Sequence, residues 1–310
     1  MTEVDREPRF LDEIEMGLGA WQWGDRVMWG YGRDYREQDV RGAFATSLVQ
    51  GIRLIDTAEI YGSGHSERLL GKFMRETNST AVIATKFFPW PWRLTQSALQ
   101  RALRGSLERM GLDKVDLYQV HWPSPLLRPE MLMEAMVECV RQGLTRAVGL
   151  SNFGWKGMLR AYSALAQHGI PLASNQVHFS LLNRRVERSG MLARCQELGV
   201  RLIAYSPLEK GILTGKYSAL HPPPGLRLGQ YAALLPRIPS LLRRMGEIGG
   251  DHGGKTPGQV ALNWVICKGA LPIPGAKTAS QALENAGALG WRLSAQAVAE
   301  LEEMSEQVLS

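Results

Sequence analysis

The sequence lacks the features that would place the protein in a membrane, outside the cell or on nucleic acid. No apolar run is long enough to cross a bilayer, and the first ten residues, MTEVDREPRF, are polar, unlike a secretory signal. There are only 3 cysteines in 310 residues, and no Lys/Arg run exceeds two despite a net charge of +6. We expect a cytoplasmic monomer with reduced cysteines that binds neither nucleic acid nor membrane, since no apolar heptad or edge strand is apparent.

Complete motifs for nucleotides, metals and activated nucleophiles are also missing. Residues 249–256, GGDHGGKT, match a phosphate-binding loop in letters, but the preceding PSLLRRMGEIG has a helical pattern where that loop needs a strand. GLGAWQ begins like a dinucleotide fingerprint, yet Gln22 replaces the third glycine. No serine or cysteine lies in a nucleophile elbow, and no His, Cys and acid cluster has metal spacing. A nicotinamide cofactor would therefore be held without a Rossmann domain.

What the sequence does contain is a regular alternation of apolar, β-branched runs with helical patterns. The runs are MGLGA, IRLIDTA, AVIATKF, VDLYQVH, RAVGLSN, LASNQVHF, RLIAYSPL and LPIPGA, starting at residues 16, 52, 81, 115, 146, 172, 201 and 271. Strands that alternate with helices pair in parallel, because each return to the sheet crosses over on a helix. Eight units without a linker predict one α/β domain over residues 1–310, a (β/α)8 TIM barrel rather than an open doubly wound sheet.

One interval, between the runs at 201 and 271, is much longer than the others. It holds a proline-rich segment, HPPPGLRLG, and two predicted helices. The second of these begins at TPGQVALNW, where Thr256 is the N-cap, Pro257 takes the first position and Gln259 completes a capping box. Loops of such length are functional or disordered.

Polar side chains end the apolar runs, at the edge where (β/α)8 barrels carry their chemistry. Asp56, Lys86 and His121 close three consecutive runs, and Tyr61 follows the first of them in a glycine-rich turn. Each alone has a structural explanation, such as a capping carboxylate or a core histidine, but buried charges must pair. We expect Asp56 to pair with Lys86, and the Lys86 charge to lower the Tyr61 pKa. Tyr61 would then protonate a carbonyl oxygen that His121 orients.

A proton donor reduces a carbonyl only if a hydride source lies opposite, and the last run offers a place for one. In IPGAKTASQALENA a strand turns through Gly275 into a helix whose free amides can bind phosphate, and Lys277 adds positive charge. Thr278 or Ser280 can instead cap this helix without any ligand. The strand-end residues suited to a nicotinamide ring and its carboxamide are Tyr205, Ser151, Asn152 and Gln176.

These segments resemble the aldo-keto reductase family along nearly the whole chain. The resemblance is carried in order by GLGAW, IDTAEIYGSGHSE, ATKF, VDLYQVHWP, VGLSNF, NQVHFS, AYSPLEKGILTGKY, TPGQVALNW and IPGAKTASQALENAGAL. It implies a (β/α)8 barrel that reduces aldehydes and ketones with NADPH. It also implies that Tyr61 is the proton donor, in a tetrad with Asp56, Lys86 and His121. The segment WQWGDRVMWGYG most resembles the cyanobacterial and plastid branch of the family.

The same resemblance implies how the cofactor is held. Residues 208–236 would cover it and gate its release. Many NADPH-preferring relatives carry an arginine where this chain has Gln281, so the implied preference for NADPH over NADH is modest. The implied cofactor-binding residues are Ser151, Asn152, Gln176, Tyr205, Ser206, Leu208, Gly211, Ile273, Gly275, Lys277, Gln281, Glu284 and Asn285.

Tryptophan is frequent, and six of the nine lie before residue 123, after the ends of the first, third and fourth runs. We expect half of these six to pack within loops and half to line an apolar pocket for aromatic or aliphatic aldehydes. The expected substrate contacts are Trp21, Phe87 and Trp122. One rival function stays open, a redox-sensing subunit that binds NADPH with little turnover, because channel-associated members of the family carry the same tetrad.

Overall fold

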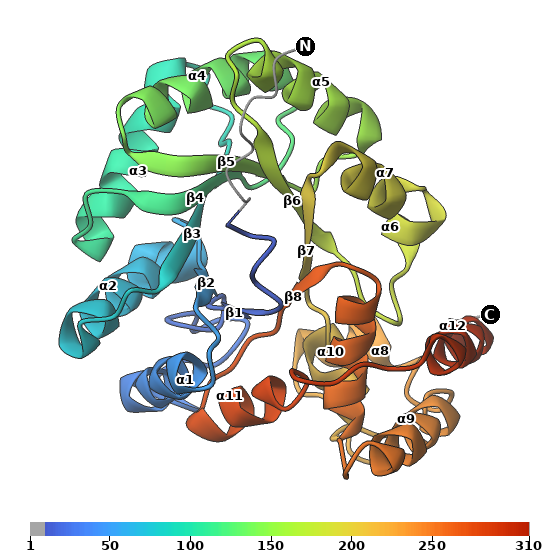
Figure 1. The fold of residues 1–310 in the computed structure, drawn as a ribbon. Coiled ribbons are helices and arrows are strands. Elements are labelled where there is room, and N and C mark those ends of the chain that lie inside the picture. Colours follow the sequence, from blue (N-terminus) through green and yellow to red (C-terminus); the bar gives the residue numbers. More distant parts are fainter. Residues whose placement is uncertain (1–9, 310) are drawn as a thin grey trace.

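The computed structural model describes residues 10–309, so the expectation for the extreme N-terminus lies outside the described residues. Eight strands form a single parallel sheet in chain order, with helices around it (Figure 1). A parallel bridge between Gly19 and Gly275 joins the first edge to the last and closes the barrel. The strands are β1 Gly17–Gly19, β2 Leu54–Asp56, β3 Val82–Phe87, β4 Val115–Val120, β5 Thr145–Ser151, β6 Leu172–His178, β7 Arg201–Tyr205 and β8 Leu271–Ile273. The predicted (β/α)8 barrel is confirmed.

Helices follow the strands and form the outer layer of the barrel (Figure 1). The helices up to β7 are α1 Glu37–Val49, α2 His65–Thr77, α3 Gln96–Met110, α4 Pro129–Arg141, α5 Trp155–Ala166, α6 Arg185–Arg188 and α7 Met191–Leu198. Those after β7 are α8 Leu226–Tyr231, α9 Pro239–Asp251, α10 Pro257–Cys267, α11 Ala279–Ala286 and α12 Ala295–Leu309. Two short 3-10 helices are η1 Tyr61–Gly64 and η2 Glu209–Thr214.

The long interval before β8 holds more structure than the sequence predicts. It contains η2, α8, α9 and α10 rather than two helices. Helix α9 occupies the residues before GGDHGGKT, so no strand precedes that loop. Helix α10 starts with the predicted capping box, in which Thr256 Oγ1 accepts from the Gln259 backbone N–H at 3.3 Å. The cap predicted for α10 is therefore confirmed, whereas α8 is an element that the sequence analysis missed.

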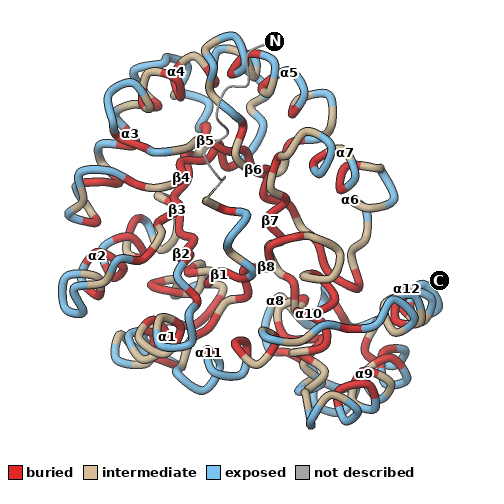
Figure 2. The backbone as a smooth tube through the Cα atoms, in the orientation of Figure 1, coloured by how far each residue is buried: buried red, intermediate tan, exposed pale blue. Residues whose placement is uncertain are grey.

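The buried apolar residues form one layer inside the barrel and another between the strands and the helices. Most residues of the strands are buried (Figure 2). Leu54, Ala84 and Leu117 pack inside the barrel, while their neighbours Ile55 and Ile83 pack outward against the helices. This alternation follows from the period of two in a strand. Polar residues that continue an inward series toward the carboxyl end of a strand therefore point into the barrel.

The structure bears on two expectations from composition, the absence of a membrane-spanning helix and the reduced state of the cysteines. No helix in the range 10–309 combines the length and apolar character that a membrane span requires. All three cysteines lie within this range and are free thiols, with Cys139 and Cys195 buried and Cys267 partly buried. Burial raises the pKa of the Cys139 and Cys195 thiols to about 12, so both are protonated and unreactive at neutral pH.

Candidate active site

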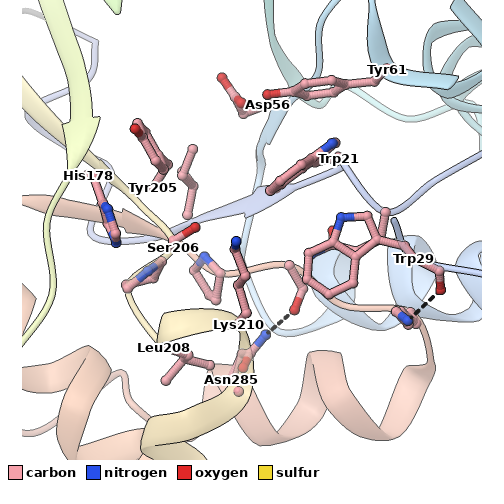
Figure 3. A pocket seen from close by; sticks show the side chains of 18 of the residues that line it. Trp21, Trp29, Asp56, Tyr61, His178, Tyr205, Ser206, Leu208, Lys210 and Asn285 are labelled. Atoms are coloured by element: carbon pink, nitrogen blue, oxygen red, sulfur yellow. Dashed lines mark hydrogen bonds between the residues drawn. The ribbon is translucent and has the colours of Figure 1, made fainter. Parts of the chain in front are cut away.

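A cavity of about 670 Å³ lies at the carboxyl ends of the strands (Figure 3). Its wall includes Asp56, Tyr61 and His121, and on the opposite side the turn from β8 into α11. Every residue predicted to bind the cofactor lines this one cavity: Ser151, Asn152, Gln176, Tyr205, Ser206, Leu208, Gly211, Ile273, Gly275, Lys277, Gln281, Glu284 and Asn285. Residues from the carboxyl ends of six strands and from the long interval before β8 are thus brought to one place.

Asp56 is the buried centre of a polar cluster inside the barrel. Lys86 Nζ forms an ion pair with Asp56 Oδ1 and also donates to the Thr57 carbonyl at 2.8 Å. The other oxygen, Asp56 Oδ2, accepts from Gln176 Nε2 at 2.8 Å and from Gln119 Nε2 at 3.2 Å. The expected pairing of Asp56 with Lys86 is confirmed. Because both carboxylate oxygens are hydrogen-bonded, the fully buried Lys86 is compensated and held in one position.

Tyr61 is held beside this ion pair by the glycine-rich turn that follows β2. Three consecutive residues, Gly62, Ser63 and Gly64, have φ of 53°, 54° and 80°, a left-handed path that favours glycine. The turn places the Tyr61 hydroxyl on the cavity wall, where it accepts a hydrogen bond from Lys86 Nζ at 3.4 Å.

The electrostatic effect on Tyr61 is opposite to the one expected from sequence. Burial, followed by the negative charge of Asp56, raises the pKa of Tyr61 well above its ordinary value. The same burial lowers the pKa of Lys86, and Asp56 acts against that change. The prediction that Lys86 lowers the Tyr61 pKa is therefore wrong for the protein alone. Desolvation of the hydroxyl is the larger cause, and the negative charge of Asp56 adds to it. Tyr61 is consequently protonated at neutral pH.

His121 follows the last residue of β4, and its imidazole packs edge-on against the Tyr61 ring at 5.7 Å and 81°. Burial, together with the Lys86 charge, lowers the pKa of His121 to about 2. The imidazole is therefore neutral. Its Nδ1 is buried and has no partner among the described residues. A neutral ring on the cavity wall beside the tyrosine can hydrogen-bond a ligand oxygen without adding a charge.

The residues expected around a nicotinamide form a connected wall. Asn152 has a left-handed φ of 63°; its Nδ2 donates to the His121 carbonyl at 3.0 Å and its Oδ1 accepts from the Tyr205 hydroxyl at 2.9 Å. The Tyr205 ring stacks on His178 at 5.3 Å and 16°. Gln176 faces the cavity, but its amide nitrogen is already bonded to Asp56. These side chains are therefore fixed before any ligand binds.

Glu209 is a functional candidate that the sequence analysis missed. It is buried behind the cavity wall with a φ of 48°, and accepts hydrogen bonds from His178 Nε2 at 2.7 Å and the Tyr231 hydroxyl at 2.8 Å. Burial alone would raise the pKa of Glu209, but bonds from His178, Ser180 and Tyr231 outweigh it and lower that pKa. Glu209 thereby ties β6, η2 and α8 together. Its position three residues after Ser206, directly past a strand end, was the available signal.

The far end of the cavity is rich in positive charge. Lys277, predicted from the sequence, donates from Nζ to the Trp29 carbonyl at 2.9 Å. Lys210, Lys216 and Arg227, which were not predicted, also line the cavity. Burial, and then the charge of Arg227, lowers the pKa of Lys277 to about 8. Within residues 10–309, none of these four cations forms an ion pair. Thr278 caps α11, accepting from the Gln281 N–H at 3.3 Å.

The predicted substrate contacts are only partly placed at the cavity. Trp21 and Trp122 line it, and Trp29 does so as well. Phe87 does not line the cavity, because it is fully buried in the outer apolar layer. The predicted contact between Phe87 and the substrate is therefore wrong. The reason is strand alternation, because Lys86 points into the barrel and its neighbour must point outward. The other early tryptophans are absent from the cavity wall; they are Trp23, Trp90 and Trp92.

Comparisons with known proteins agree with this geometry. The sequence profile described as "Aldo/keto reductase family" matches residues 15–306. The chain is 43% identical over 296 residues to "Pyridoxal reductase, chloroplastic" of Arabidopsis thaliana, covering 91% of this chain and 80% of that protein. This plastid relative is consistent with the branch that the tryptophan-rich segment resembles.

Solved structures of aldo-keto reductases are also similar to this chain. The thermostable aldo-keto reductase Tm1743, crystallised with the inhibitor epalrestat, is 31% identical with a TM-score of 0.75 and coverage of 94% of both chains. An aldo-keto reductase from Klebsiella pneumoniae in complex with NADPH is 28% identical with a TM-score of 0.74, covering 93% of this chain and 90% of that chain. The likeness therefore extends over the barrel and the long interval before β8.

Proposed function

Because this chain belongs to the aldo/keto reductase family, we propose that it reduces aldehydes and ketones to alcohols with NADPH, using Tyr61 as the proton donor. The protein is an NADP-dependent oxidoreductase, in line with its reductase relatives and with the NADPH complex of a structural neighbour. The observation that carries the finer proposal is the protonated Tyr61 hydroxyl on the cavity wall, 3.4 Å from Lys86 Nζ.

The residues present fit NADPH as the cofactor. The cavity is large enough for an extended ligand, and its four unpaired cations suit the negative charge of a diphosphate and a 2′-phosphate. Lys277 and Gln281 lie at the start of α11, where we place the adenosine end. Tyr205 and Asn152 lie near His121, where we place the nicotinamide.

The chain's own residues account for the proton transfer. NADPH, when bound, supplies a hydride to the carbonyl carbon. His121, neutral at working pH, hydrogen-bonds the carbonyl oxygen and orients it toward Tyr61. As negative charge develops on that oxygen, the Tyr61 hydroxyl gives up its proton, because an alkoxide is a stronger base than a phenolate. The Lys86 ammonium then stabilises the phenolate that remains, and the product is a neutral alcohol.

We propose that residues 208–236 cover the bound dinucleotide. The residues of this segment that line the cavity include Lys210, Gly211, Lys216 and Arg227. Within the segment Tyr231 donates to Glu209, and Glu209 bonds His178 of β6. Since these contacts have to open for the cofactor to leave, release is expected to limit turnover.

The substrate side favours small aromatic aldehydes. Trp21 lies 6.4 Å from the Tyr61 ring at an angle of 32°, and Ile60 and Trp122 complete an apolar rim. A flat ring can stack against Trp21 with its aldehyde toward Tyr61. The Arabidopsis relative is named a pyridoxal reductase, and pyridoxal is an aldehyde of this kind. We therefore propose pyridoxal and similar aromatic aldehydes as substrates.

The test is NADPH consumption with pyridoxal and with benzaldehyde, for the wild type and for Tyr61→Phe. We expect the substitution to lower kcat by about 10²–10⁴-fold, the usual contribution of a general acid, and to leave the NADPH dissociation constant unchanged. Tyr162→Phe is the matched control, because Tyr162 lies in α5 and does not line the cavity. Equal turnover in wild type and Tyr61→Phe would contradict the mechanism. Tight NADPH binding without wild-type turnover would favour the redox-sensing function.

A further inference from the structure

Trp29 has a feature that the proposed chemistry does not use. It lies in the loop between β1 and α1, lines the cavity, and is only 6% exposed. Its indole Nε1 is buried and has no hydrogen-bond partner among the described residues. A buried donor without an acceptor is costly. Trp264 Nε1 is also unpartnered, but Trp264 lies in the core away from the cavity, so of these two residues only Trp29 lines the cavity.

Figure 3 shows the Trp29 ring next to Trp21, with Tyr61 on the far side of Trp21. On one side the Trp29 ring packs edge-on against Trp21 at 5.4 Å and 86°, and Trp21 in turn neighbours Tyr61. On the other side Lys277 Nζ lies 5.1 Å and the Arg227 guanidinium 5.3 Å from the ring centroid. The order along the wall is therefore the proton donor, Trp21, Trp29 and then the cations.

We propose that the Trp29 indole N–H donates a hydrogen bond to a diphosphate oxygen of the dinucleotide. The inference rests on the proposed function, in which the nicotinamide lies near Tyr61 and the 2′-phosphate near Lys277. The diphosphate joins these two parts and so passes the middle of the wall, at Trp29. Lys277 holds the Trp29 backbone through its bond to the carbonyl, and cation–π contacts from Lys277 and Arg227 hold the ring, so the donor is oriented in advance.

The experiment measures dissociation constants for NADPH and NADH by fluorescence titration without a carbonyl substrate. Trp29→Phe keeps a six-membered aromatic ring under the two cations and removes the N–H together with the pyrrole part of the indole. We expect both dissociation constants to rise by the same factor, about tenfold, as for a lost hydrogen bond to a charged group. Affinity for adenosine 2′-monophosphate, which has no diphosphate, is expected to stay unchanged. Trp29→His, which restores a ring donor, is expected to recover part of the dinucleotide affinity.

Trp264→Phe is the matched control, because it removes an equally unpartnered indole N–H outside the cavity and is expected to leave both constants unchanged. Weakening of NADPH alone would place the Trp29 donor at the 2′-phosphate and overturn the inference. Unchanged binding of both dinucleotides by folded Trp29→Phe would overturn it as well, while the proposed function would stand. A wild type that binds neither dinucleotide would instead overturn the proposed function together with this inference.

Discussion

In the part of the chain that the structure describes, positively charged side chains are paired at one end of the cavity, beside Tyr61, and unpaired at the other end, beside Trp29. At the tetrad end, Lys86 is fully buried and its charge is paired with Asp56, whose other oxygen is also hydrogen-bonded. At the cation end, Lys277 and Arg227 approach the same tryptophan ring, and neither forms an ion pair within residues 10–309. Repulsion from Arg227, added to burial, lowers the pKa of Lys277 to about 8.

This difference in pairing indicates that the lysine at the tetrad end and the cations at the other end have different roles. A paired, buried lysine contributes to the stability of the protein itself and keeps neighbouring protons in fixed places. Unpaired cations facing one another lower the stability of the free protein and gain their partner only when an anion binds. The tetrad end is therefore complete without a ligand, and the cation end is completed by one. Each prediction below tests this contrast.

The largest effect is expected from Lys86→Met, which leaves the buried Asp56 carboxylate unpaired. Removing one partner of a buried ion pair costs about 3–5 kcal/mol, and the phenolate of Tyr61 also loses its cation. We expect a lower free energy of unfolding in urea and loss of carbonyl reduction. The double variant Asp56→Asn with Lys86→Met is expected to regain part of the stability but no activity. A Lys86→Met protein as stable as the wild type would contradict the assignment of Lys86 as a paired charge.

At the cation end the corresponding change, Lys277→Met, is expected to act with the opposite sign on the free protein. It removes a positive charge that Arg227 repels, so the urea midpoint should be unchanged or slightly higher. The dissociation constant for NADPH should rise about tenfold, with kcat at saturating NADPH unchanged. Lys268→Met is the control, since Lys268 is paired with Glu187 and Glu302 away from the cavity. A clear loss of stability in Lys277→Met would contradict the assignment of Lys277 as an unpaired charge that lowers the stability of the free protein.

The same contrast explains what the sequence could predict. The regular apolar runs predicted the barrel. The polar residues that close those runs predicted the tetrad, because the carboxyl ends of the strands have a fixed place in this fold. The Phe87 contact was wrong because the period of two within β3 was not applied beyond Lys86. Glu209 was missed because it lies in η2, whose backbone is irregular, so no period relates position to direction. Arg227 was missed because it lies in α8, a short helix that the sequence did not predict.

The pKa of Tyr61 shows a different limit on what can be predicted from the sequence. Its charged neighbours were correctly identified from the sequence, and the expected direction was still wrong. The direction depends on how much water reaches the hydroxyl and on how strongly the Asp56 charge acts on it. Both quantities come from three-dimensional packing, so the sequence supplies the groups but not the balance between them.

The smallest effect expected is a change of NADPH affinity with pH, confined to the cation end. The pKa of Lys277 falls from an ordinary 10.5 to about 8 in the folded protein, so between these values the unfolded chain binds more protons and stability rises with pH. Bound phosphates favour the charged lysine. The NADPH dissociation constant should therefore rise a few-fold, about three to ten times, from pH 7 to pH 9.5.

At the tetrad end neither Tyr61 nor His121 titrates over this interval, because the pKa of Tyr61 lies well above it and that of His121, at about 2, lies far below it. Asp56 acts against the burial that lowers the pKa of Lys86. We expect kcat at saturating NADPH to stay flat while the dissociation constant rises, and we expect Lys277→Met to remove the rise. Measuring both quantities on one set of samples separates the two ends directly. If kcat instead fell across this interval and NADPH affinity stayed constant, the titrating group would belong to the tetrad, and the division between paired and unpaired charge would be incorrect.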